Sequence, residues 1–447
     1  MGPVAAQLRR QATPMAVGLL SMTAFRALEM YFVSLLGDAP LAAISFTFPV
    51  VWLLTSVIIG FEAGTASCIS RAIGKQDSAM ARRQTTDTVV LVGIVSVALC
   101  TAGYFAINPL FRLLGATDEL LPLIHEYMGI WFFSQPAAAV MWICLASMRA
   151  RGNSLLEGKV ISIAALINVA LDPIFIFGWF GFPRLEIAGA AWAAVVANVI
   201  MLVATLGFLQ FRLRVFATPF AAFATILDSW KRTLHVGLPA MATYMIGPIS
   251  NGIIVSLVAT FGVNAVAGFG VGMRIEPIVL LAFYALSAVT SPFIGQNYTS
   301  GNLARIETAR HSIARFCIGY GLSAAVVLAL VAYPLAALFS DSGQIIEVAT
   351  QYLWIMAISY GGFGMAMSSC SAFNGMGYPS PALVISATRT LILFIPLALL
   401  GKALLGLNGI FTASALTNLS VGVLGFVWLG RRIELSKREQ DQPSSGS

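Results

Sequence analysis

Charged residues are scarce in this sequence. Asp, Glu, Lys and Arg make up 10% of its 447 residues, whereas hydrophobic residues make up 58% and the mean hydropathy is +0.86. Soluble globular domains carry about 25% charged residues on average. The composition therefore excludes a water-soluble protein and predicts a polytopic membrane protein.

Signatures of catalysis and metal binding are also missing. The chain has no Gly-x-x-x-x-Gly-Lys-Ser/Thr loop for phosphates, no His-Glu-x-x-His pair for zinc and no Gly-x-Ser-x-Gly turn for a serine nucleophile. We therefore expect no enzyme activity, no cofactor and no metal centre. If the protein is a pump, its energy must come from an ion gradient, because the chain has no motif for nucleotide hydrolysis. No cysteine belongs to a Cys-x-x-Cys pair, so we interpret all five as packing residues: Cys68, Cys100, Cys144, Cys317 and Cys370.

Long apolar segments occupy most of the chain. A helix that spans a bilayer needs about 20 mostly apolar residues. The sequence predicts an all-α membrane protein with twelve transmembrane helices, near residues 13–36, 42–68, 86–108, 121–147, 157–178, 187–210, 234–261, 265–293, 310–333, 347–372, 380–401 and 407–430.

The net charge of +7 is explained by where the basic residues lie. With the N-terminus inside, most Lys and Arg residues fall in the cytoplasmic segments, three lie within helices, and three fall outside, namely Arg112, Arg184 and Lys402. The positive-inside rule then places both termini in the cytoplasm. We expect a multi-pass protein of the plasma (inner) membrane, in contact with lipid and without a nucleic-acid partner.

The sequence contains an internal repeat. Pro14 and Pro239, near the starts of the first and seventh predicted helices, lie 225 residues apart, and so do Tyr127 and Tyr352. Six helices per repeat give two halves of the same orientation, related by a pseudo-twofold axis along the membrane normal. We predict two six-helix bundles around a central cavity, divided as 1–210 (N-terminal lobe), 211–233 (cytoplasmic linker), 234–430 (C-terminal lobe) and 431–447 (polar cytoplasmic tail).

A polar cluster interrupts the fifth predicted helix. Asn168 and Asp172 are four residues apart, so they lie on one helix face. Pro173 has no N–H, which leaves the carbonyl of Val169 without its helical partner and predicts a bend. An Asp in a membrane helix costs roughly 2.5–3.5 kcal/mol on insertion scales, and such residues usually mark functional sites.

Comparison of the halves adds Glu29 to this cluster. Glu29 follows Pro14 by fifteen residues, whereas the matching residue of the second half is Ile254. We expect titratable chemistry to be concentrated in the N-terminal half, with the C-terminal half providing mostly shape. Two alternatives remain open: Arg26 is three residues from Glu29 and suits a purely structural pair with it, or Arg26 pairs with Glu62.

Other intramembrane polar residues have open interpretations. Glu62, Arg26, Glu276 and Arg274 are kept as possible secondary residues of the site. Arg274 is interpreted as a structural tether at a helix bend. Arg389 either pairs with an acid or extends its charge to the membrane surface. Tyr127 either anchors the chain at the membrane interface or lines a cavity.

Several motifs, taken in order, resemble the multidrug and toxic compound extrusion (MATE) family, in its DinF-like branch. The resemblance covers residues 13–430. It is carried by Pro14 with Glu29, Ser70 to Asp77, Arg149 to Asn153, Asn168 with Asp172 and Pro173, Phe175 to Gly178, Gly189 to Ala191, Arg274 to Glu276, and Gly295 to Asn297.

The resemblance implies a secondary antiporter that exports organic, often cationic and amphipathic, compounds in exchange for protons or sodium ions. It assigns the cation or proton site of the N-terminal lobe to Glu29, Asn168, Asp172 and Tyr127. Relatives usually carry Asp at the position of Glu29. At Ala194 they often carry a Thr, which would supply one more oxygen. Because hard cations want several oxygen ligands, we favour protons and keep sodium at Glu29, Asn168 and Asp172 as a weak alternative.

We expect a monomer that works by alternating access. In this hypothesis Glu29 and Asp172 are ionised when open to the cytoplasm and attract a cationic substrate, and protonation from outside releases it. Pro14 would let its helix bend as Glu29 changes charge. Two other functions stay open: a lipid-linked oligosaccharide flippase of the same superfamily, and a membrane scaffold or receptor without transport.

Overall fold

The structure, a computed structural model, describes residues 3–218 and 222–441. It packs as two compact units. The N-terminal unit comprises residues 13–237, and the C-terminal unit comprises the chain from residue 238 onward together with residues up to 12. Both are built from long apolar helices, and no strand occurs in the described ranges.

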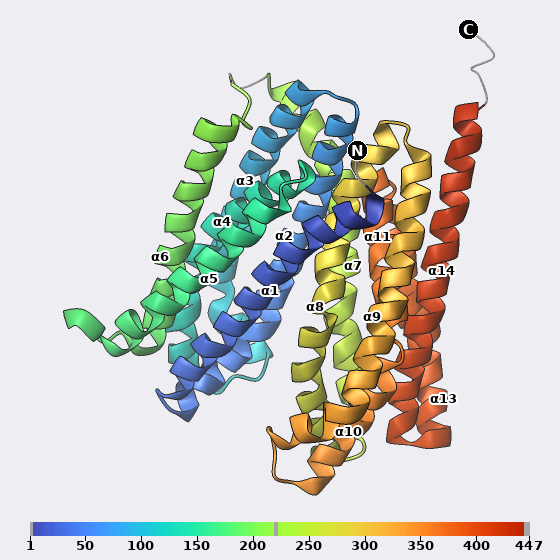
Figure 1. The fold of residues 1–447 in the computed structure, drawn as a ribbon. Helices are drawn as coiled ribbons and strands as arrows, with labels where there is room; N and C mark the ends of the chain where they lie inside the picture. Colours follow the sequence, from blue (N-terminus) through green and yellow to red (C-terminus); the bar gives the residue numbers. More distant parts are fainter. Residues whose placement is uncertain (1–2, 219–221, 442–447) are drawn as a thin grey trace. The chain divides into compact units, whose positions relative to one another are not determined.

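The N-terminal unit contains most of α1 (Val4–Ser34), all of α2 (Asp38–Gly74), α3 (Ser78–Leu113), α4 (Leu121–Ala150) and α5 (Ser154–Phe177), and α6 (Glu186–Gly207) with its π-helical extension η2 (Phe208–Leu213). A short 3-10 turn, η1 (Trp179–Gly181), joins α5 to α6. Figure 1 shows these helices running along one another. The helix α4 is central, since it packs against α2, α3, α5 and α6.

The C-terminal unit contains the second part of α7 (Phe223–Ala259), then α8 (Val263–Thr299), α9 (Leu303–Ala337), α10 (Gly343–Ala357), α11 (Tyr360–Met376), α12 (Pro379–Ala387), the π-helix η3 (Thr388–Phe394), α13 (Ile395–Leu405) and α14 (Leu407–Asp441). Its α11 packs against α8, α9 and α14.

The predicted all-α membrane fold is confirmed. Eleven helices in the described ranges are long and apolar enough to cross a membrane, and α10 with α11 form a twelfth span that is bent by 56°. This bent pair corresponds to the predicted span 347–372. The eleventh predicted span, 380–401, is a continuous stretch of α12, η3 and α13 in which the middle segment has π-helical hydrogen bonding.

The division of the chain differs from the predicted lobes at the two repeat-related helices. The unit boundary falls between Ala12 and Thr13 within α1, and between Gly237 and Leu238 within α7. These boundaries are 225 residues apart, one residue before Pro14 and Pro239. The sequence does not mark these positions, because the apolar pattern continues through α1 and α7 without a break. Val4 and Leu8 accordingly pack in the core of the C-terminal unit.

The predicted linker and tail are largely helical where they are described. Within residues 211–233, η2 ends at Leu213 and α7 begins at Phe223, while residues 219–221 lie outside the described ranges. The helix α14 extends through residues 431–441, and residues 442–447 of the predicted tail also lie outside them.

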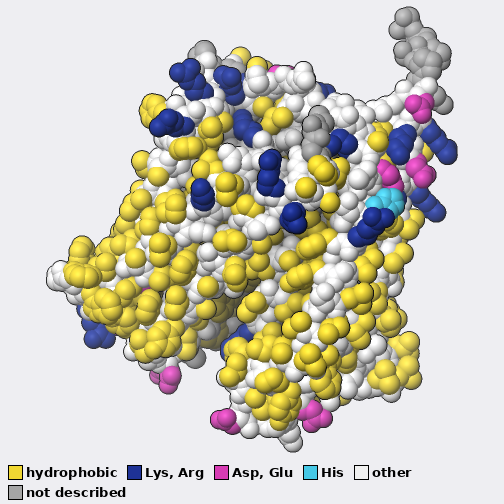
Figure 2. Space-filling model, viewed as in Figure 1, with side chains coloured by type: hydrophobic (Ala, Val, Ile, Leu, Met, Phe, Trp, Pro, Cys, Tyr) yellow, Lys and Arg dark blue, Asp and Glu magenta, His cyan; other side chains and the backbone are white. Residues whose placement is uncertain are grey.

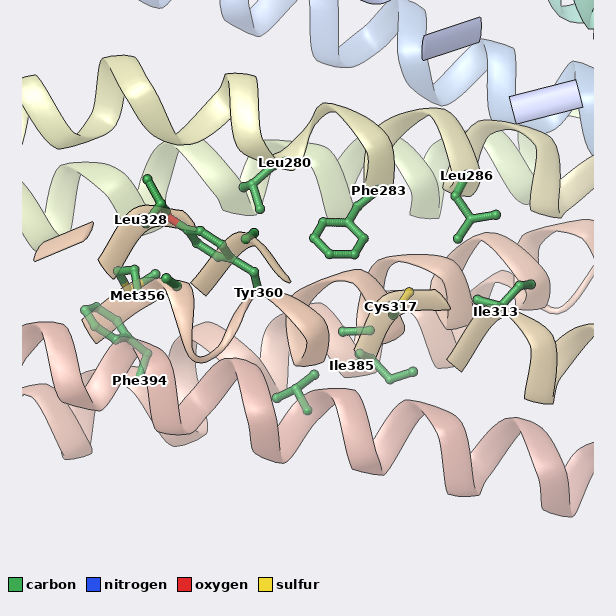
Figure 3. Packing of buried hydrophobic residues seen from close by; sticks show 14 of the residues in the cluster. Leu280, Phe283, Leu286, Ile313, Cys317, Leu328, Met356, Tyr360, Ile385 and Phe394 are labelled. Carbon is green, nitrogen blue, oxygen red and sulfur yellow. The ribbon is translucent and has the colours of Figure 1, made fainter. Parts of the chain in front are cut away.

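The core of the C-terminal unit relies on close helix contacts at small residues. A Cβ atom added to Gly362 would lie 2.7 Å from the Asn418 carbonyl oxygen, so α11 and α14 meet nearly backbone to backbone. Figure 3 shows large buried side chains filling the remaining space, with Tyr360 among Leu280, Leu328 and Met356. These contacts fix the positions of the polar residues described below.

Lys and Arg side chains gather toward one end of the helices in each unit, as Figure 2 shows. Hydrophobic side chains cover most of the remaining face in that view. This asymmetry agrees with the charge distribution from which the orientation was predicted. The cytoplasmic location of the termini stays a prediction.

Candidate functional site

Asp172 is enclosed within the N-terminal unit. Its side chain has no solvent exposure, and neither carboxylate oxygen has a hydrogen-bond partner among the described residues. The helix α5 continues through Pro173 to Phe177 and ends at Gly178, whose φ of 77° suits a left-handed helix cap. A carboxylate held in this way is costly when ionised, because no donor replaces the water it has lost.

Glu29 of α1 lies near Asp172. The two acids are close enough for their charges to interact. The helices α1 and α5 run side by side over this stretch, since the Ser162 hydroxyl donates to that of Ser21 at 3.2 Å and Gly18 packs against Gly158. The two acids that the sequence singled out are therefore within electrostatic range of each other, and no hydrogen bond joins them in the described chain.

Tyr127 of α4 belongs to the same cluster. It is buried, with 7% relative exposure, and its hydroxyl lies within electrostatic range of Glu29, Asp172 and Arg26. Of the two interpretations from the sequence, the structure supports the internal position, because a residue enclosed by its own unit does not anchor the chain at a lipid interface.

Asn168 is the weakest member of the predicted set. It is half-buried one turn before Asp172, and the described residues offer it no hydrogen bond. The predicted bends leave both helices unbroken, since Pro14 lies inside α1 and Pro173 inside α5. Pro14 nevertheless packs closely, and its carbonyl meets the backbone of Gly158.

The suggested pairing of Glu62 with Arg26 is wrong. Glu62 of α2 accepts a hydrogen bond from Arg149 at 3.1 Å, and Arg149 also pairs with Glu157 of α5. Arg26 is exposed, and its charge acts on Glu29 without an ion pair within 4 Å in the described chain. This pairing is hard to predict from the sequence, because Arg149 belongs to a predicted cytoplasmic turn.

The C-terminal unit contains a polar cluster of its own, which corrects the expectation that it provides mostly shape. Tyr352 of α10 donates a hydrogen bond to the Glu276 carboxylate of α8 at 2.8 Å. Tyr360, at the start of α11, and Arg389, in η3, lie within electrostatic range of the same carboxylate. Glu276 precedes Pro277 as Asp172 precedes Pro173, and this shared acid-proline pattern was the available signal.

Arg389 is held in place on two sides. Its Nε donates to Asn418 of α14 at 3.0 Å, and its guanidinium lies 5.1 Å from the ring centre of Phe363. The Asn418 amide in turn donates to the Ser359 hydroxyl at 3.2 Å. By contrast, the predicted tether Arg274 is exposed, and the described chain gives it no hydrogen bond or ion pair.

The described residues include no group of three or more His, Cys, Asp or Glu side chains arranged to hold a metal ion.

These features define a class: a membrane protein of two repeated helical bundles, with an unpaired buried acid in the first. Comparison with known proteins identifies the family. The profile of the MatE family matches residues 14–174 and again residues 239–400, so the repeat is itself one family unit occurring twice. The chain belongs to the MATE family of transporters.

Individual relatives cover nearly the whole chain. A protein of Shewanella oneidensis named FAD transporter is 33% identical over 96% of this chain and 95% of its own length. The multidrug export protein MepA of Staphylococcus saprophyticus is 24% identical over 89% of this chain and 87% of its own. The crystal structure of the Vibrio cholerae MATE transporter VcmN in the bent form has a TM-score of 0.92 and 28% identity, covering 97% of this chain and 98% of the other.

Proposed function

We propose that this transporter is an antiporter that exports organic cations in exchange for protons, with Asp172 and Glu29 as the shared binding site. The observation that carries the proposal is the Asp172 carboxylate, which is buried, has no hydrogen-bond partner in the described chain and interacts with Glu29. Two acids in one site cannot both be ionised cheaply, so the site favours either a proton or the positive charge of a ligand.

Competition between these two ligands supplies the coupling. When the acids are ionised, they attract a cationic substrate, and when a proton binds, the attraction is lost. A ligand drives a conformational change only through its different affinity for the two states. Proton uptake on the outside and release on the inside would therefore give each state a different affinity for substrate.

Protons suit this site better than sodium. A hard cation requires several oxygen ligands arranged around it. The N-terminal site offers the oxygens of Asp172, Glu29 and Tyr127, while Asn168 makes no hydrogen bond that orients its amide toward them. A proton needs one oxygen only.

The flavin dinucleotide FAD is a second candidate substrate. This candidate is suggested by the name of the Shewanella relative, which is 33% identical over nearly the whole length of both chains. Its pyrophosphate is anionic, so ionised Asp172 and Glu29 would repel it. Protonation of these acids would then favour FAD binding, whereas export in exchange for protons requires protonation to release the substrate. FAD export would require contacts away from this site.

Proteoliposomes containing the purified protein test both points. The organic cation ethidium is the probe. We expect the protein to transport ethidium across the proteoliposome membrane when a pH gradient is imposed, and not when a sodium gradient of equal size is imposed. Movement driven only by sodium would contradict the choice of ion. Movement of FAD without ethidium would contradict the choice of substrate, and movement of neither under both gradients would contradict antiport.

A further inference from the structure

Arg149 bridges a buried and a half-buried carboxylate at the end of the N-terminal unit opposite Asp172. It lies in the last turn of α4 and pairs with Glu62 of α2 at 3.1 Å and with Glu157 in the first turn of α5. The relative side-chain exposures are 6% for Arg149, 14% for Glu62 and 0% for Glu157. Three helices are thus joined through one guanidinium.

The charges of this cluster do not balance. Two ionised carboxylates and one guanidinium leave a net charge of −1 in a buried site, and burying an uncompensated charge is unfavourable. One oxygen of Glu157, Oε2, is enclosed and has no hydrogen-bond partner in the described chain. A single proton on the pair would make the cluster neutral.

Among the described residues, no other charge supplies the compensation. Arg149 and Glu62 act on Glu157, and Arg149 is the cation that acts on Glu62. On α3, Arg83 and Asp87 pair with each other at 2.8 Å. The part of α1 that packs on α5 has no charged residue between residues 13 and 25, and the only acid of α6, Glu186, begins that helix beyond the far end of α5.

We propose that the cluster of Glu62, Arg149 and Glu157 is a second proton-binding site, which holds one proton shared between its two carboxylates. Interacting acids titrate as a pair, so the proton belongs to the cluster and not to one residue. Glu157 and Asp172 are fifteen residues apart on α5, or about 22 Å at 1.5 Å per residue. The two proton sites are therefore separate.

The position of the cluster connects it to α1. Gly158, the residue after Glu157, is where the Pro14 carbonyl meets α5. Protonation would release one arm of the Arg149 bridge and loosen the turn of α5 against which Pro14 packs. This step deepens the proposed antiport, because it gives protons a second point of action on the same pair of helices.

Infrared spectroscopy of the full-length protein in lipid nanodiscs tests the proposal directly. Protonated carboxyl groups have a distinct C=O stretching band, which is titrated with pH. Glu62→Gln or Glu157→Gln alone should each remove the same band, with the area of one carboxyl. The remaining acid then balances Arg149 one to one and stays ionised.

Glu439→Gln is the matched control, because Glu439 forms an exposed pair with Arg432 at 3.2 Å. It should leave the band unchanged. The proposal is overturned if neither cluster variant removes a band, or if only one does. If Glu157→Gln fails to fold, Glu62→Gln, at a more exposed position, still decides whether the band is lost. Asp172→Asn should remove a different band, and its transport assay tests the antiport separately.

Discussion

Asp172 of α5 and Glu276 of α8 are acids within membrane helices of the two units, but they are not repeat counterparts and they differ in how they are held. Each directly precedes a proline in a membrane helix, and each lies near one of the repeat-related tyrosines, Tyr127 and Tyr352. Asp172 has no hydrogen-bond partner in the described chain, whereas Glu276 accepts a hydrogen bond from Tyr352 and has Arg389 nearby. Asp172 is therefore available to a ligand, whereas the carboxylate of Glu276 already has a hydrogen-bond partner within the protein.

This contrast suggests different roles for the two acids. A group that binds and releases a proton in each cycle must exchange partners, so a permanent hydrogen bond and a fixed counter-charge work against it. Glu276 has both, and the network continues through Arg389 to Asn418. We interpret the C-terminal cluster as the structural member of the pair and the N-terminal cluster as the coupling member.

The largest difference between the two acids is expected when Asp172 and Glu276 are replaced in turn. Asp172→Asn should abolish the dependence of substrate export on the pH gradient, a loss of roughly 5- to 150-fold if the coupling has the usual size of such energies. Glu276→Gln should keep the dependence, although its expression falls. Substrate flux into proteoliposomes at several imposed pH gradients measures both.

Correct insertion of both variants, checked by size-exclusion chromatography, is the control for this experiment. Equal loss of coupling in the two variants would contradict the division of roles, because it would make the acid of the C-terminal unit a coupling residue as well.

A smaller effect is expected at the two tyrosines. Tyr352→Phe removes the hydrogen bond to the Glu276 carboxylate, and hydrogen bonds to charged groups contribute roughly 1.5–3 kcal/mol. Tyr127→Phe removes a hydroxyl with no hydrogen bond in the described chain, so it should destabilise the protein less than Tyr352→Phe does. Thermal unfolding in detergent compares these matched substitutions, and a larger loss at Tyr127 would show that its hydroxyl has a structural partner.

The sequence predicted the fold well, and it singled out two acids that the structure places within electrostatic range of each other. Twelve spans follow from apolar length, and the repeat follows from the matched positions of Pro14 and Pro239. Asp172 was identifiable because a carboxylate in an apolar helix needs a reason, and Glu29 because its counterpart in the second half is Ile254. Each of these signals is local or depends on a fixed offset along the chain.

The pairs that were missed depend on tertiary packing. Glu62 and Arg149 are 87 residues apart, and Glu157 looked like an ordinary acid in the first turn of a helix. Their meeting depends on how α2, α4 and α5 converge. Tyr352 reaches Glu276 because α10 packs on α8 at Gly272, where a Cβ atom would collide with the tyrosine ring. Such contacts leave no periodic pattern in a sequence.

The smallest expected effect concerns the two arginines. Double-mutant cycles measure how strongly Glu276 interacts with Arg389, and Glu29 with Arg26, when each residue is replaced by Gln or Met. Arg389 is fixed by Asn418 and Phe363 near a half-buried acid, so an interaction of about 1 kcal/mol is expected. Arg26 is exposed, and such pairs contribute about 0.2–1 kcal/mol. A stronger interaction for Glu29 with Arg26 would mean that Glu29 also has a fixed partner, and the contrast between the units would then depend on Asp172 alone.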